Sequence, residues 1–212
     1  MLFRSADAKQ KISLGRGLVR EDVSAVLFDE PLTVIDPHLK WQLRRKLKQI
    51  HHELKLTLVY VTHDQVEALT FADQVVVMTR GRAVQIGSAE DLFERPQHRF
   101  VGHFIGSPGM NFLPASLAPQ APVGAATLGV RPEYVRLAAA GEAGALPAQV
   151  HQVLDVGTYT LLTAGIGDAL VRARLAPDVS VPPVGSTVHL LLVGAHTCWY
   201  GADETLMNKV AA

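Results

Sequence analysis

Hydrophobic and polar positions along residues 1–107 predict strands and helices in alternation. Residues 25–28 are a short continuous apolar run, typical of a strand that is buried on both faces. Apolar residues then recur at spacings of three and four through Pro37–Leu54, which predicts a helix with one apolar stripe. Asp36 is a plausible N-cap for this helix, and Pro37 suits its first position.

The pattern beyond this helix predicts a second strand, a short helix and a hairpin. Thr57–Val61 is apolar and β-branched, as strands are, and Gln65–Phe71 fits a short helix. Residues 75–78 and 83–86 flank Arg-Gly-Arg, which predicts a hairpin. Ser88, with Asp91 three residues later, resembles a capping box at the start of another helix.

The pattern changes after residue 106. Residues 106–127 are rich in Gly, Pro, Ala and Ser, which indicates a linker or a boundary. Beyond them, short β-type runs are broken by Gly and Pro, and helical periodicity is nearly absent. We therefore predict an α/β first part, followed by a small barrel or sandwich made of strands.

Composition excludes several classes of protein. Hydrophobic residues make up 48% of the 212 and charged residues 19%, which allows a sizeable core and argues against disorder. The 20 basic and 20 acidic residues give no net charge, so we expect no nucleic-acid partner. The sequence holds neither a signal-peptide pattern nor an apolar run of the roughly 20 residues that a membrane helix needs, so a membrane role would require a partner protein.

Two carboxylates directly follow the first predicted strand. In an open parallel sheet, ligands bind beyond the carboxyl ends of the strands. At that edge Asp29 would hold Mg²⁺, and Glu30 would orient or deprotonate the water that attacks a γ-phosphate. Taken alone, the pair is equally compatible with a strand that simply ends at the surface.

A histidine follows the second predicted strand. If the two strands are parallel and joined by the Pro37–Leu54 helix, His63 lies at the same edge as Glu30. There it could bond both a γ-phosphate oxygen and the attacking water. The alternative is a histidine that caps the next helix. Asp36 likewise has two interpretations, a helix cap or a contact with a partner ATPase subunit.

These segments resemble the ATP-binding subunits of ABC transporters of the carbohydrate-uptake type. VLFDEP resembles the Walker B strand, LTVIDPHLK the D-loop with Asp36, and VYVTHDQVEALTFAD the switch-histidine segment. LGVRPE, with Arg131, Pro132 and Glu133, resembles a motif of the transport-associated, oligonucleotide-fold-like (OB-like) regulatory domain. The sequence of residues 27–44 further resembles that of ATP-binding subunits of glycerol or sugar-alcohol importers.

The resemblance implies an incomplete P-loop ATPase domain at residues 1–107, a linker at 108–127 and an OB-like domain at 128–212. It implies ATP and Mg²⁺ as cofactors, catalytic Glu30 and His63, and Asp29 on the metal. It also implies a second ATPase subunit and membrane permease subunits as partners. The protein would be cytoplasmic and held at the inner face of the cell membrane through the permease.

The sequence departs from the family pattern at two places. It contains no G-x-x-x-x-G-K-S/T loop, and the dipeptide Gly-Lys occurs nowhere, although that loop cradles the phosphates of ATP. The family's L-S-G-G-Q signature, which contacts the nucleotide of the opposite subunit, is replaced by an altered segment of four residues: Ser5, Ala6, Asp7 and Ala8. The alternative is that this segment is only a helix start, where Asp7 is favourable.

Two functions are compatible with this pattern. The chain is either the truncated ATPase subunit of an importer for sugars, glycerol or related polyols, or a non-catalytic regulatory or ligand-binding module derived from one. Whether the chain is an enzyme is left open, because without the phosphate loop we expect no activity from it alone. A decayed gene product without function is a third alternative. We also expect exposed sheet edges and low stability for the isolated chain.

Overall fold

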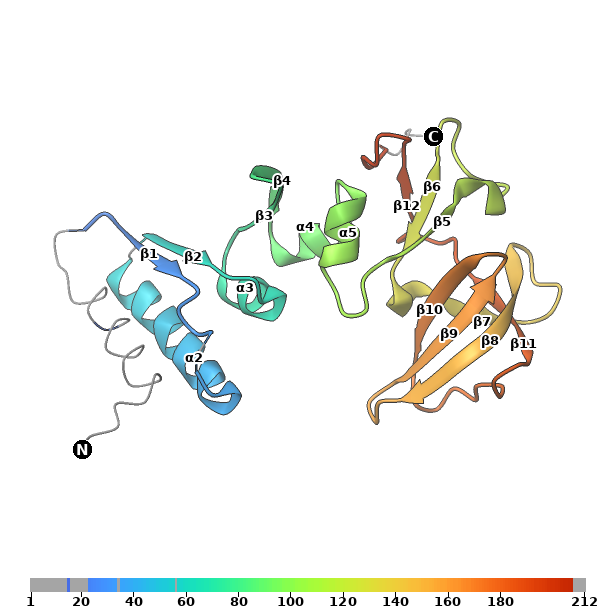
Figure 1. Ribbon diagram of the computed structural model, residues 1–212, viewed down its shortest axis with the longest axis horizontal. Coiled ribbons are helices and arrows are strands. Elements are labelled where there is room, and N and C mark those ends of the chain that lie inside the picture. The colour runs from blue at the N-terminus through green and yellow to red at the C-terminus, as the bar shows by residue number, and fades with distance from the viewer. Residues whose placement is uncertain (1–14, 16–22, 34, 56, 208–212) are drawn as a thin grey trace. The chain divides into compact units, whose positions relative to one another are not determined.

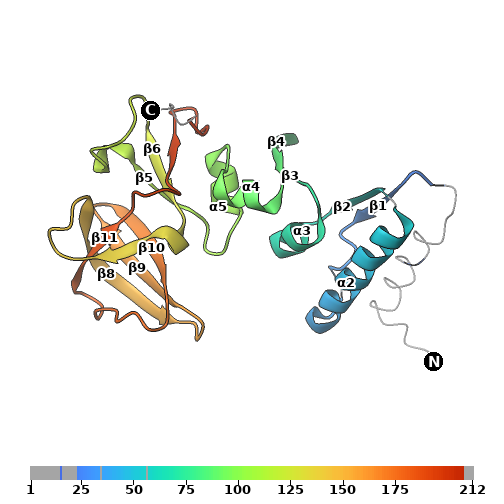
Figure 2. The ribbon, with the colours of Figure 1, turned by 180° about the vertical axis from the view of Figure 1, so that it is seen from behind.

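A computed structural model describes residues 15, 23–33, 35–55 and 57–207. The chain divides into two compact units, Met1–Val75 and Val76–Ala212. Figures 1 and 2 show the elements of each unit from two opposite sides. No helix in the described ranges is long and apolar enough to cross a membrane.

The first unit is built around a β-α-β arrangement. Strand β1 (Ala25–Asp29) and strand β2 (Thr57–Val61) are parallel neighbours, and helix α2 (Pro37–Leu54) connects them. The register runs from Ala25 opposite Thr57 to Asp29 opposite Val61, so both strands end at the same edge. Helix α3 (Gln65–Phe71) follows β2. The parallel pairing on which the prediction for His63 depended is therefore present.

Local signals fix both ends of α2, and those at its start are the ones that the sequence predicts. The Asp36 carboxylate accepts a hydrogen bond from the His38 backbone N–H at 2.9 Å, and proline occupies the first turn. Lys55 ends the helix in the left-handed conformation, with φ of 51°. Asp64 caps α3 in the same way, because its carboxylate accepts from two backbone N–H groups in the first turn of that helix. The prediction of Asp36 as a helix cap is confirmed.

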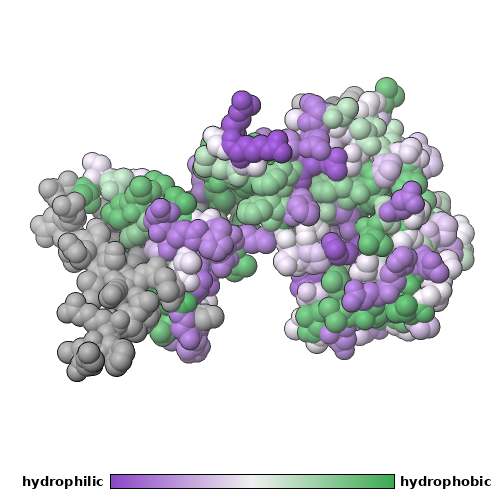
Figure 3. Space-filling model, in the orientation of Figure 1, coloured by the Kyte–Doolittle hydropathy of each residue, from purple (hydrophilic) through white to green (hydrophobic). Residues whose placement is uncertain are grey.

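Only one face of the β1–β2 sheet is buried. Val26 and Phe28 form a core with Leu32, Ile35 and Leu47, against which α2 packs. On the other face Leu27 is 68% exposed, Val59 49% and Val61 47%, and Figure 3 shows hydrophobic atoms over this part of the unit. The expectation of a strand buried on both faces is wrong for β1, because no layer among the described residues covers this second face.

A hairpin and two short helices precede the β domain. β3 (Val75–Thr79) and β4 (Arg82–Gly87) form a two-stranded sheet, which confirms the predicted hairpin. Arg80 and Gly81 both have positive φ, as the preferred two-residue hairpin turn requires. A capping box at Ser88 begins α4 (Ala89–Glu94), also as predicted, and α5 (Arg99–Phe104) follows.

The remainder of the second unit is made of strands. One sheet has the order β10-β9-β8-β11-β7 and the other the order β12-β6-β5. Their bounds are Asn111–Pro114 (β5), Thr127–Val130 (β6), Arg136–Ala138 (β7), Ala145–Asp155 (β8), Thr160–Ile166 (β9), Ala169–Leu175 (β10), Thr187–Leu191 (β11) and Cys198–Tyr200 (β12). Two 3₁₀ turns, η1 (Ala115–Leu117) and η2 (Pro132–Tyr134), complete it.

The larger sheet is curled around an apolar core, consistent with the predicted OB-like domain. Leu128, Val150, Leu162, Val171 and Leu190 are among its fully buried members. The pairing of β8 with β9 shifts register after Val150, and such bulges bend a strand and increase its twist. One difference from the sequence prediction concerns the linker: β5 lies within residues 108–127 and pairs with β6, because its apolar residues join that sheet.

Candidate functional site

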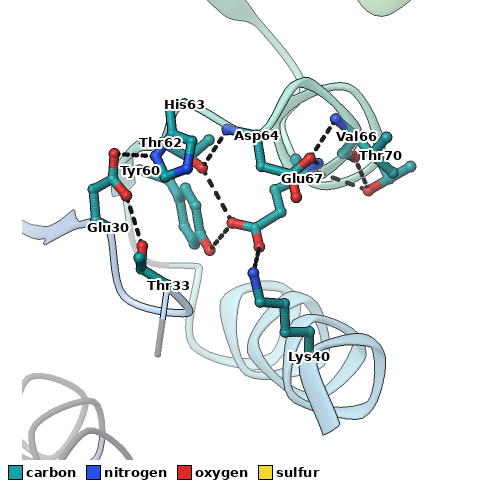
Figure 4. A network of polar contacts seen from close by, with 10 residues as sticks. All are labelled: Glu30, Thr33, Lys40, Tyr60, Thr62, His63, Asp64, Val66, Glu67 and Thr70. Atoms are coloured by element: carbon teal, nitrogen blue, oxygen red, sulfur yellow. Dashed lines mark hydrogen bonds and ion pairs between the residues drawn. The ribbon is translucent and has the colours of Figure 1, made fainter. Parts of the chain in front are cut away.

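The carboxyl ends of β1 and β2 bring the predicted residues together. The Glu30 backbone N–H donates to the Val61 carbonyl at 2.9 Å, which extends the parallel pairing one residue beyond β1. Asp29 therefore ends β1 in an exposed position, and Glu30 and His63 follow at the same edge. Figure 4 shows Glu30 and His63 pointing toward one another.

Glu30 is held by two side chains. One carboxylate oxygen lies 2.6 Å from Nδ1 of His63, and the other accepts a hydrogen bond from the Thr33 hydroxyl at 2.6 Å. The Glu30 backbone has φ of 48°, a left-handed conformation that non-glycine residues rarely adopt. Such strained backbone is frequent at functional sites. The turn at residues 30–33 thus positions the carboxylate toward β2.

The contact shifts both pKa values toward charged forms. Hydrogen bonds from Thr33 and then from His63 lower the pKa of Glu30 below its ordinary 4.5. The hydrogen bond with Glu30 and its negative charge raise the pKa of His63 above its ordinary 6.5. A carboxylate with a lowered pKa is a weaker base. This geometry therefore suits Glu30 better to orienting a water than to holding its proton.

The pH dependence of this ion pair follows from the two shifts. The stabilisation from His63 is complete below pH 6.5 and is lost as pH rises through its raised pKa. The stabilisation from Glu30 is present above pH 4.5 and is lost as pH falls through its lowered pKa. The Glu30–His63 ion pair therefore stabilises the fold most between pH 4.5 and pH 6.5.

Replacement of Glu30 by glutamine is expected to lower the pKa of His63 toward its ordinary value. An amide carries no charge to stabilise the imidazolium ion. An NMR titration of the His63 ring protons measures this shift directly. The control is Thr33→Val, which removes a bond only from Glu30 and leaves the His63 titration close to that of the wild type. Equal titration of His63 in the wild type and the glutamine variant would contradict the ion pair.

A second acid, Glu67, is buried behind this edge. It is 3% exposed, and its Oε2 accepts from the Tyr60 hydroxyl at 2.9 Å and from the Thr62 hydroxyl at 3.2 Å. Lys40 on α2 lies 3.4 Å from its other oxygen (Figure 4). Burial, followed by the bond to Glu67, raises the pKa of Tyr60. Because Thr62 immediately precedes His63, this network holds the turn that carries the histidine.

Sequence reasoning did not identify Glu67, Thr33 or Lys40. Glu67 occupies a helix position that is ordinarily exposed, and no local pattern shows that it faces Tyr60 and Lys40 instead. The signal that was available is its position four residues after His63, which places it in the first turn of α3. All three are positioning residues. Thr33 holds the Glu30 carboxylate, whereas Lys40 holds Glu67, which in turn bonds to Thr62 beside the histidine.

The other predicted site residues lie elsewhere or outside the described part. Ser5, Ala6, Asp7 and Ala8 are outside the described residues. Pro132 begins η2 and is buried. Glu133 forms an ion pair with Arg174 at 3.4 Å.

Arg131 is buried and joins two parts of the second unit. It is 1% exposed, and its guanidinium donates to four backbone carbonyls near the ends of α4 and α5: Leu92, Phe93, Gly102 and Ile105. The guanidinium also stacks over the Phe93 ring at 4.1 Å. Burial lowers its pKa, and the negative ends of the two helices favour the cation. This geometry favours a structural role for Arg131 over a role in a ligand pocket.

Comparison with known proteins agrees with this organisation. Residues 128–198 match the TOBE domain. The chain is 42% identical over 200 residues to the uncharacterized ABC transporter ATP-binding protein y4oS of Sinorhizobium fredii, covering 84% of the chain and 53% of the relative. It is 40% identical over 208 residues to the sn-glycerol-3-phosphate import ATP-binding protein UgpC of Pectobacterium atrosepticum. This match covers 89% of the chain and 57% of the relative. The chain thus spans little more than half the length of these relatives.

Proposed function

We propose that this chain is the C-terminal part of an ATP-binding subunit of an ABC importer for sugars, glycerol or related polyols. The observation that carries the proposal is the Glu30–His63 contact at the carboxyl edge of a parallel β-α-β unit. Similarity to glycerol-3-phosphate import ATP-binding proteins over 89% of the chain supports it.

Each part of the chain then has a role. Residues 1–107 form the C-terminal half of an α/β nucleotide-binding domain. Residues 108–212, in which β5 pairs with β6, form the OB-like regulatory domain. A second ATPase subunit would contact the first part through Asp36 and through the segment of Ser5, Ala6, Asp7 and Ala8. Permease subunits would hold the assembly at the cytoplasmic face of the membrane.

The residues at the β1–β2 edge suit nucleotide hydrolysis. Bound ATP with Mg²⁺ would supply the γ-phosphate that is attacked. Asp29 presents an exposed carboxylate at the strand end, and carboxylate oxygens are the ligands that Mg²⁺ prefers. Glu30 would orient the attacking water, and the raised pKa of His63 favours an imidazolium ion that can donate to a phosphate oxygen. Glu67 and Thr62 hold the histidine in place.

The exposed face of the β1–β2 sheet fits a missing layer. Parallel sheets are ordinarily covered on both faces, and Leu27, Val59 and Val61 leave one face apolar and open. The relatives contain additional sequence of roughly equal length, and this chain has no Gly-Lys phosphate loop. Nucleotide binding is therefore proposed to require a polypeptide that supplies both the loop and the missing layer.

A chimera tests this proposal. The portion of a UgpC relative that precedes the matched region is placed ahead of residue 1, and steady-state ATP hydrolysis is measured with Mg²⁺. We expect hydrolysis by the chimera and none by the 212-residue chain. The control chimera carries alanine for the phosphate-loop lysine and should be inactive. Equal hydrolysis by the 212-residue chain alone would show that the added half is dispensable and would contradict the proposal.

A regulatory module without catalysis is the second candidate. The second unit contains a hollow of about 250 Å³, lined mainly by apolar groups that include Leu117, Leu128 and Leu192. A small molecule bound there would change NMR signals of the second unit only, including those of Leu117, Leu128 and Leu192. A panel of sugars and polyols that leaves all these signals unchanged would count against this candidate.

A further inference from the structure

A second hollow lies between α2 and α3, away from the Glu30–His63 contact. It measures about 340 Å³ and is lined by residues of α2 (Trp41, Arg44, Arg45, Lys48) and α3 (Val66, Thr70, Phe71). We call it the α2–α3 hollow. It lies entirely within the first unit, and neither the nucleotide chemistry nor the regulatory domain accounts for its composition.

The charged residues that line this hollow are all basic. Three of its lining residues are cations and none is an acid. Within the described ranges, none of the three cations is in an ion pair, and Lys48 donates only to the backbone carbonyl of Thr70, at 3.4 Å. The single acid of α3, Glu67, is turned toward Tyr60 and Lys40. The chain is neutral overall, so this positive charge is a local property of the hollow, whose lining contains no acid.

Apolar groups accompany the cations. The Trp41 side chain is 58% exposed, and Val66 across the hollow is 56% exposed. The Arg45 guanidinium lies 5.7 Å from the centre of the indole ring. Exposed tryptophan and arginine are the residue types that dominate binding energy at protein interfaces. The combination therefore resembles a protein-docking surface more than an ordinary solvated helix face.

The hollow is poorly suited to a free phosphate group. Phosphate sites usually offer backbone N–H donors at a helix N-terminus or in a loop. The cations here project from the middle of α2, where the backbone N–H groups are used within the helix. The first turns of α2 and α3 are already capped by Asp36 and Asp64. Side-chain cations with an exposed indole instead match carboxylates that are presented beside apolar side chains.

We propose that the α2–α3 hollow docks an acidic, amphipathic helical segment of a partner protein. Carboxylates of the segment would lie against Arg44, Arg45 and Lys48, and an aliphatic side chain would cover Trp41 and Val66. This is the helix-in-groove mode of recognition, in which charge selects the partner and an apolar anchor supplies affinity. The proposal requires neither ATP nor the phosphate loop.

The test uses Trp41 as the reporter in the full 212-residue chain. The chain has two tryptophans, so Trp199→Phe leaves Trp41 alone. The probe is a synthetic helical peptide of about 15 residues with leucine on one face and glutamate on the other. Its binding is expected to shift Trp41 emission to shorter wavelength. Arg45→Glu is expected to weaken the affinity by about tenfold or more, because it replaces attraction by repulsion.

Matched controls separate this proposal from its alternatives. Lys46→Glu makes the same charge change on the same helix, but Lys46 does not line the hollow and bonds to Gln49 instead. It should change the affinity by less than about twofold. Trp41→Ala should also weaken binding, which is then measured with a fluorophore-labelled form of the same peptide. Far-UV circular dichroism checks that each variant remains folded.

Three results would overturn the proposal. The first is equal affinity in Arg45→Glu and Lys46→Glu, and the second is equal binding of a peptide with lysine in place of glutamate. The third is an Arg45-dependent shift of Trp41 emission by anionic lipid vesicles or by inorganic pyrophosphate without any shift by the acidic peptide. That outcome would assign the hollow to a membrane surface or to a phosphate.

Discussion

Arg131→Met is expected to lower the free energy of unfolding of the second unit by about 3–5 kcal/mol. The guanidinium is buried and donates to four backbone carbonyls near the ends of α4 and α5. Methionine has a comparable stem but no N–H donor, so the carbonyls of Leu92, Phe93 and Ile105 lose this donor, whereas that of Gly102 still accepts from the Met110 backbone N–H at 3.0 Å. Each buried polar group left without a partner costs about 1–3 kcal/mol, less where water can enter.

Chemical denaturation in a Trp41→Phe background, followed by Trp199 fluorescence, measures this loss, because Trp199 packs against the core of the second unit. Arg131→Lys should fall between the wild type and the methionine variant, since an ammonium group lacks the planar fork of guanidinium. The control is Arg136→Met, an exposed arginine paired with Glu142, for which we expect a loss below about 1 kcal/mol. An Arg131→Met loss as small as that of the control would contradict the structural role.

Features with local causes could be predicted from the sequence. The bounds of α2 follow from Asp36 and Pro37 at its start and from its apolar stripe, and the capping box at Ser88 marks the start of α4. The meeting of Glu30 with His63 also followed from local reasoning, because parallel strands joined by one helix end at the same edge. In each case the determining residues lie close together in the chain or in one β-α-β unit.

Features that depend on distant partners could not be predicted. Glu67 has the pattern of an ordinary helix residue, and only packing against Lys40 and Tyr60 buries its charge. The position of Arg131 was recognisable, but its partners lie 26 to 39 residues away, and composition does not show which carbonyls need a donor. Composition also predicted a linker where β5 joins a sheet, because Gly and Pro near a strand conceal a short apolar run.

We propose that Glu30 orients the attacking water at the β1–β2 edge. Its carboxylate lies 2.6 Å from His63 and is anchored by Thr33, and glutamine would preserve its size while removing its charge. Loss of a group that positions the attacking water or carries its proton costs about 10²–10⁴ in rate. The same loss should occur in any complete nucleotide site built around this chain.

The most direct measurement is ATP hydrolysis by the chimera with Glu30→Gln, beside ATP binding by the same protein. We expect hydrolysis to fall by about 10²–10⁴ while the affinity for ATP changes by less than about threefold. The matched control is Glu53→Gln, the same change at an exposed acid of α2 that bonds to Gln49, and it should hydrolyse ATP at the unaltered rate. Hydrolysis by Glu30→Gln at the rate of this control would contradict the account.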